Sequence, residues 1–113
     1  MRQGHIWEIN LSPTVGAEIK KKRPAVIISD DAIGLLPLRV IVPVTEWKKS
    51  FHGAVWMVKI DPNEHNNLKK TSATDCFQIR SISTKRFLTK IGDVSPKTLN
   101  EIKTAVKALI DAD

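Results

Sequence analysis

The sequence is poor in cysteine and has no long apolar segment. Its only cysteine is Cys76, so no disulfide can form within the chain, and a lone thiol is typical of proteins in a reducing compartment. No apolar run approaches the roughly 18 residues that cross a membrane. No long apolar stretch follows the first charge, as it would in a signal peptide. We therefore expect a cytoplasmic protein without a membrane partner.

The sequence also lacks the common catalytic signatures. It contains no glycine-rich phosphate loop, no HExxH, no CxxC and no pair of histidines at ligand spacing. The three histidines, His5, His52 and His65, are scattered, and no feature near Cys76 would activate a thiolate. We therefore expect no metal, no cofactor and no nucleophilic side chain.

What the chain has in excess is positive charge. Its 113 residues contain 18 Lys and Arg against 12 Asp and Glu, which gives a formal net charge of +6. This length predicts a single domain, residues 1–113. A small basic domain favours a polyanionic partner, with nucleic acid first and an acidic protein second. The alternative is a basic surface that only faces solvent.

Short, β-branched apolar runs separated by turn residues predict a mostly β fold. In the first run, Trp7, Ile9 and Leu11 share one face. Ser95 is a good helix cap and Pro96 a good first residue, so a C-terminal amphipathic helix is expected over 96–111. Leucines between the second and third runs are expected to cover the core: Leu35, Leu36 and Leu38. The expected strands are 5–11, 25–29, 40–44, 54–60 and 72–79.

A basic run, Lys20, Lys21 and Lys22, leads into Arg23 at the start of the second strand, and Thr45 ends the third. If these strands pair antiparallel, the guanidinium and the hydroxyl meet at one end of the sheet. Arginine can hold a phosphate through two parallel hydrogen bonds. Glu18, in the same loop, could orient that guanidinium. The pattern indicates a phosphate site, although such a run is also typical of a solvated loop.

Aromatic and basic residues alternate in the loop after Thr45. Trp47 and Phe51 flank Lys48 and Lys49, and aromatic faces among lysines suit the bases of single-stranded nucleic acid. The alternative is that the two rings pack against the core.

The motifs in order resemble those of MazF/PemK/Kid-type toxins. The matching segments are Gly4–Trp7, Leu11–Glu18, Lys22–Ser29, Val42–Thr45, Gln78–Ile82 and Ile91–Gly92. The resemblance covers nearly the whole chain and implies an SH3-like β-barrel that forms a homodimer. It also implies a type II toxin–antitoxin system, in which an acidic antitoxin binds a sequence-specific, metal-independent endoribonuclease (an mRNA interferase).

In this family the ribose 2′-hydroxyl of single-stranded RNA attacks the phosphate, which leaves a 2′,3′-cyclic phosphate and a 5′-hydroxyl. The resemblance therefore implies a catalytic role for Arg23, Thr45 and Glu18. Arg23 would stabilise the charge on the phosphorane and Thr45 would hydrogen-bond a phosphoryl oxygen. Gln78 and Arg80 are further candidates for RNA contacts or supports, together with the lysines and Phe51.

The sequence departs from the family pattern at three positions. Phe77 stands where many relatives carry an acidic residue before the glutamine, and Ala17 stands where some carry histidine. Asp75 stands where Kid-like members have arginine. The proton-transfer partner is therefore open, with His52 as one candidate. Two other functions also remain: a non-enzymatic poison like CcdB, which binds gyrase, and a binding module that has lost catalysis.

Overall fold

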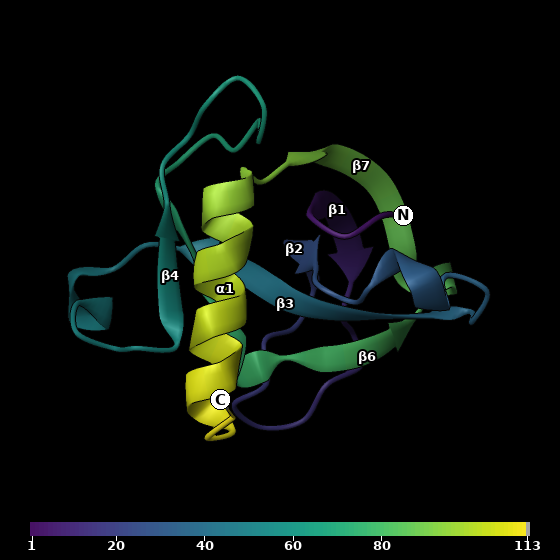
Figure 1. Cartoon of the computed structure of the whole chain (residues 1–113), viewed down its shortest axis with the longest axis horizontal. Helices are drawn as coiled ribbons and strands as arrows, with labels where there is room; N and C mark the ends of the chain where they lie inside the picture. The colour runs from purple at the N-terminus through teal and green to yellow at the C-terminus, as the bar shows by residue number, and fades with distance from the viewer. Residues whose placement is uncertain (113) are drawn as a thin grey trace.

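The computed structural model describes residues 1–112, which form one seven-stranded sheet and a C-terminal helix (Figure 1). Strand order is β4-β5-β3-β2-β1-β7, with β6 paired to β3, and every pairing is antiparallel. The strands are β1 (His5–Asn10), β2 (Lys22–Ile27), β3 (Leu38–Glu46), β4 (Met57–Ile60), β5 (Ser72–Asp75), β6 (Arg80–Ser83) and β7 (Phe87–Asp93).

Strand β3 is the longest and joins the two parts of the sheet. Residues 38–41 pair with β6 and residues 41–43 pair with β2. Its last three residues pair with β5, beginning at Val44 opposite Thr74. No pairing among the described residues joins the outer strands β4 and β7, so the sheet is not closed. The expected class, a mostly β fold with a C-terminal helix, is confirmed, with an open barrel.

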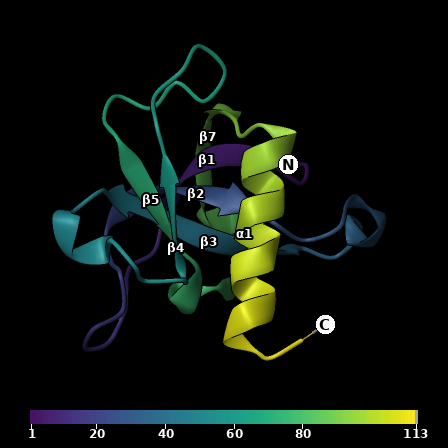
Figure 2. The ribbon, with the colours of Figure 1, turned by 60° about the vertical axis from the view of Figure 1, so that its left-hand side comes forward.

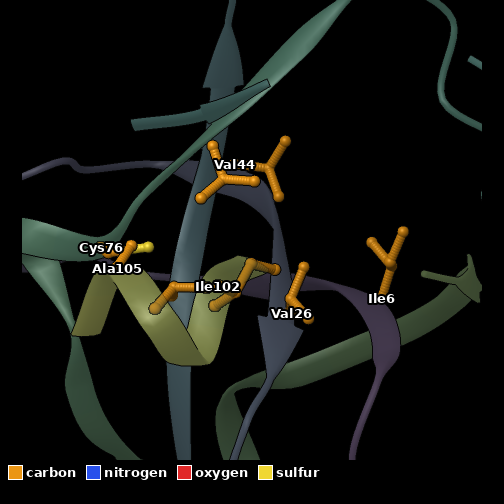
Figure 3. Close-up of a cluster of buried hydrophobic side chains, with 8 residues drawn as sticks. Ile6, Val26, Val44, Cys76, Ile102 and Ala105 are labelled. Atoms are coloured by element: carbon orange, nitrogen blue, oxygen red, sulfur yellow. The ribbon is translucent and has the colours of Figure 1, made fainter. Parts of the chain in front are cut away.

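Helix α1 (Pro96–Leu109) packs against β4 on one face of the sheet (Figure 2). Ser95 Oγ accepts a hydrogen bond from the N–H of Thr98 at 3.1 Å, as expected of a cap. Ile102 and Ala105 of the helix lie beside Cys76 and Val26 in the larger core (Figure 3). The helix therefore buries its apolar face on its own sheet. Within residues 1–112, no helix is long and apolar enough to cross a membrane.

A second core lies on the opposite face of β2 and β3. Trp7, Ile9 and Leu11 all contribute to it, as their alternation predicts. Ala25 and Ile27 of β2 and Ile41 of β3 are fully buried there. Because side chains on both faces of β2 and β3 are packed, the ends of these strands are held rigidly.

The expectation that three leucines cover the core is wrong. Leu35, Leu36 and Leu38 are 102%, 54% and 45% exposed. The Arg39 guanidinium donates to the carbonyls of Leu36 and Gly34, at 2.7 and 3.2 Å, and holds this segment folded on itself. The leucines consequently point outward.

The expected strand 72–79 is also interrupted. Strand β5 ends at Asp75, and a 3-10 turn, Cys76–Gln78, precedes β6. The Asp75 carboxylate accepts the N–H of Phe77 at 3.1 Å, which favours a turn over a continued strand.

Candidate functional site

Arg23 and Thr45 lie at the same end of the sheet, as the sequence predicts. Ala25 of β2 pairs with Pro43 of β3 in the antiparallel register. Arg23 and Thr45 follow two residues further toward this end, so both side chains fall on the face of that pair. The two residues line one pocket of about 210 Å³.

The other wall of this Arg23–Thr45 pocket comes from the segment between β4 and β5. Leu68, Lys69 and Lys70 line it, and Lys70 Nζ lies 3.9 Å from a carboxylate oxygen of Glu46. Both partners of that pair are exposed, so the attraction is weak and the ammonium is available to a phosphate. The pocket therefore brings together one guanidinium, two ammonium groups, the hydroxyls of Thr45 and Ser72, and the Glu46 carboxylate, and its cations outnumber its anion.

The backbone, rather than Glu18, orients the Arg23 guanidinium. Arg23 Nε donates to the carbonyl of Lys20 at 3.1 Å. The Glu18 carboxylate instead accepts the N–H of Val15 at 2.8 Å and so closes a turn within its own loop. The ion pairs among residues 1–112 do not include Arg23. Its terminal nitrogens are thus free for an anion.

Gln78 ties the β1–β2 loop to the turn before β6. Its Oε1 accepts the N–H of Ile19 at 2.6 Å, and its Nε2 donates to the carbonyl of Ala17 at 3.1 Å. Both ends of the amide are therefore used within the protein. The geometry supports the predicted supporting role of Gln78 and leaves little capacity for direct RNA contact.

A second pocket, of about 420 Å³, lies between this loop and the turn. Its rim carries Glu18, Arg80 and Phe77, and its floor includes Pro43. Pro43 is two residues from Thr45 on the same face of β3, a separation of about 6.8 Å. The two pockets are therefore neighbours, and Glu18 belongs to the second one.

The remaining predicted residues line neither pocket. Phe51 stacks edge-on against Trp47, with ring centroids 5.8 Å apart, and Lys59 covers the Trp47 ring at 5.3 Å. This loop therefore packs largely on itself. The predicted lysines are all exposed and line neither pocket: Lys20, Lys21, Lys22, Lys48 and Lys49.

Sequence reasoning missed Lys69, Lys70 and Phe77 as site residues. For the lysines, the signal in the sequence is a basic pair close to the start of a strand, since Lys70 is two residues before β5. The sequence alone does not locate this pair, because only the pairing of β5 with β3, Ala73 opposite Thr45, places that strand start beside the pocket.

Two titratable groups near the site are perturbed by burial. Burial raises the pKa of the Cys76 thiol to about 11, so the thiol stays protonated and unreactive at neutral pH. Burial also raises the pKa of the Asp75 carboxyl, against hydrogen bonds from the Phe77 and Gln78 backbone that lower it. His52 is exposed in the β3–β4 loop and lines neither pocket. Residues 1–112 contain no cluster of three potential metal-binding side chains.

Comparison with known proteins identifies the family. The model of the PemK-like, MazF-like toxin of type II toxin–antitoxin systems matches residues 2–110. The chain belongs to this toxin family. Endoribonuclease MazF9 of Mycobacterium tuberculosis is 32% identical, over 98% of this chain and 97% of the relative. Endoribonuclease PemK of Escherichia coli is also 32% identical, over 90% of this chain and 76% of the relative.

Solved structures show the same toxin fold. A crystal structure of MazF from Deinococcus radiodurans superposes with a TM-score of 0.81 at 24% identity, covering 98% of this chain and 96% of the other. A mycobacterial endoribonuclease in complex with its cognate antitoxin gives a TM-score of 0.80 at 19% identity, covering 100% and 97%. These likenesses confirm the fold.

Proposed function

We propose that this member of the toxin family is a metal-independent, sequence-specific endoribonuclease that cleaves single-stranded RNA. The observation that carries the proposal is the pocket in which Arg23 and Thr45 meet beside Lys69 and Lys70. The curated relatives named above are endoribonucleases, so a non-enzymatic poison and a binding module without catalysis are not favoured.

In the proposed reaction the ribose 2′-hydroxyl attacks the adjacent phosphorus. The 2′-hydroxyl loses its proton as the O2′–P bond forms, and the P–O5′ bond breaks. The leaving 5′-oxygen takes up a proton, so the products are a 2′,3′-cyclic phosphate and a 5′-hydroxyl. The Arg23 guanidinium stabilises the negative charge that develops on the phosphoryl oxygens, and the Thr45 hydroxyl donates a hydrogen bond to one of them. A guanidinium keeps its proton in proteins, so Arg23 acts through its charge. Glu18, in the neighbouring pocket, is the acidic candidate for proton transfer.

The proposed partners are RNA, an acidic antitoxin and a second copy of the chain. The complex of the mycobacterial endoribonuclease with its cognate antitoxin supports the antitoxin. The cations of the Arg23–Thr45 pocket and the exposed lysines support an acidic antitoxin segment that competes with RNA. Exposed Leu35, Leu36 and Leu38 support a homodimer, because clustered apolar side chains on a surface mark interfaces. We place the protein in the cytoplasm, where mRNA is found. We also propose that residues 1–113 belong to a single domain.

Cleavage of a long single-stranded RNA in EDTA tests the function. Arg23→Ala and Thr45→Val are expected to slow cleavage by about 100- to 1,000-fold each, as the loss of a transition-state donor does. Lys97→Ala, an exposed change on α1 outside both pockets, is the control and should cleave at the wild-type rate.

Fragments from the wild type should end in a cyclic phosphate. Intact RNA with the purified wild type would refute the nuclease. Equal cleavage by wild type and Arg23→Ala would retain the nuclease but move its centre away from this pocket.

A further inference from the structure

Phe77 is an aromatic side chain held out in solvent at the rim of the second pocket. It is 65% exposed, although a phenylalanine is normally buried. Neither the proposed chemistry nor the core uses it. Its position thus calls for a ligand with a flat apolar face.

The ring is presented on a rigid turn. The Phe77 N–H is bound by the Asp75 carboxylate at 3.1 Å, and the Cys76 N–H is bound by the Trp56 carbonyl at 2.9 Å. The Trp56 ring meets Phe77 edge-on, with centroids 5.8 Å apart and planes at 78°. This contact restrains the ring, which lowers the entropy lost when a ligand stacks on it.

The groups around the ring suit a nucleobase. Arg80 offers a guanidinium donor, one of the groups that hydrogen-bond base edges. Among the large apolar side chains that line this pocket, Phe77 alone is exposed. A protein interface needs a larger contiguous apolar area, so this surface fits a single flat group better.

The pocket is also at the right place along a bound strand. Its floor residue Pro43 lies two residues from Thr45 on the same face of β3, about 6.8 Å away. A nucleotide next to the scissile phosphate is therefore placed to enter the pocket that Phe77 lines.

We propose that Phe77 is a stacking platform for a base that flanks the cleaved phosphate, and that Arg80 reads the edge of that base. The proposal rests on the proposed function to the extent that RNA occupies the Arg23–Thr45 pocket. It makes Phe77 a specificity residue: it acts on binding and on the choice of cut site, and it takes no part in the bond-breaking step.

The test measures binding separately from cleavage. The first probe is a random-sequence pool of short single-stranded 2′-O-methyl RNA, which lacks the attacking hydroxyl. The oligonucleotide of this pool that binds most tightly is then synthesised as a series, with an abasic residue at each position in turn. Phe77→Ala should bind this oligonucleotide about 5- to 150-fold more weakly, the fold-change that corresponds to one base–aromatic stack. Phe77→Trp should restore the affinity. Leu88→Ala removes another exposed apolar side chain, 45% exposed and outside both pockets, and should change nothing.

The abasic series identifies the stacked base. An abasic residue at one position should weaken binding to the wild type. The same abasic residue should not weaken binding to Phe77→Ala any further, because the two changes remove the same contact. Equal affinity of Phe77→Ala and wild type would overturn the proposal, as would a defect seen only in oligomeric mass or antitoxin binding, which would assign the ring to a protein interface.

The two proposals fail separately. If the wild type cleaves RNA and Phe77→Ala binds the oligonucleotide as tightly as the wild type does, only the stacking proposal is rejected. A wild type that shows the Phe77-dependent binding but leaves RNA intact rejects the nuclease alone. A wild type that binds no oligonucleotide and also leaves RNA intact rejects both.

Discussion

Gln78 Oε1 accepts a hydrogen bond from the N–H of Ile19 at 2.6 Å, across 59 positions of sequence. The same amide donates to the carbonyl of Ala17. These two bonds fasten the β1–β2 loop, which carries Glu18 and leads to Arg23, onto the turn that carries Phe77. One side chain thus sets the width of the second pocket.

Gln78→Ala should release this loop. Loss of two hydrogen bonds is expected to lower the free energy of unfolding by about 1–3 kcal/mol and to raise KM for RNA more than it lowers kcat, because the pocket walls lose their alignment. Amide hydrogen exchange at Ala17–Ile19 should accelerate. The control is Gln3→Ala, which removes an amide bound to the Ile28 carbonyl outside both pockets. An unchanged KM in Gln78→Ala, or the same rise in Gln3→Ala, would contradict the role.

Lys69 and Lys70 should contact phosphates of the bound RNA. Replacing both by alanine is expected to weaken RNA binding and to reduce the slope of log K against log salt by about 0.7 for each phosphate contact that is lost. The matched control is Lys97→Ala with Lys107→Ala, which removes the same charge from exposed positions on α1. If both double variants lose the same slope, the effect is one of net charge and the lysines have no specific place at the site.

The sequence predicts the Arg23–Thr45 pair because antiparallel pairing of two apolar strands brings their ends together without any detail of the loops. It does not predict the second pocket. That pocket depends on the break of the chain at Asp75 and on an amide bridging 59 residues, and no periodicity encodes either feature. The exposed Leu35 was misjudged for a related reason: apolar character predicts burial only where the backbone turns the side chain inward, and Arg39 holds this segment outward.

Asp75 should make stability fall as pH rises. Burial raises the pKa of its carboxyl in the folded protein, so the folded state holds this proton more tightly than the unfolded chain. Ionisation between the unfolded and the folded pKa therefore favours unfolding, and the penalty persists at higher pH. Asp75→Asn keeps an oxygen that can accept the Phe77 N–H without the charge. This variant should be more stable than wild type near neutral pH, and denaturation curves should converge below the ordinary carboxyl pKa of 3.8.

Asp75→Ala separates the charge from the hydrogen bond. It removes the buried charge, and it also removes the acceptor that holds the turn. It should therefore gain less stability than Asp75→Asn, and it should weaken RNA binding at Phe77. If the extra stability of Asp75→Asn over wild type increased as the pH falls, the predicted direction of the pH dependence would be wrong.

Gly92 of β7 has no space for a side chain. A β-carbon there would lie 2.5 Å from the carbonyl oxygen of His65 and 2.7 Å from that of Asn66, both of them backbone atoms that cannot swing away. The Asn66 side chain is only 1% exposed, and it fixes its loop by donating to the Asp61 carbonyl at 2.9 Å. This loop leads into Leu68–Lys70 at the Arg23–Thr45 pocket, so β7 indirectly positions the pocket wall.

Gly92→Ala is therefore expected to lower the free energy of unfolding by about 1–3 kcal/mol, as overpacking does, measured by denaturant titration. It should also weaken RNA binding beyond the unfolded fraction, because the displaced loop moves Lys69 and Lys70. Gly34→Ala is the control: its φ is −65°, its β-carbon would meet its nearest atom at 3.1 Å, and it lies outside both pockets. Gly34→Ala should lower the free energy of unfolding clearly less than Gly92→Ala does, and it should leave RNA affinity unchanged. A Gly92→Ala variant as stable as wild type would mean that the loop at His65 and Asn66 can move away from β7 at little cost. The position of the pocket wall would then not depend on Gly92.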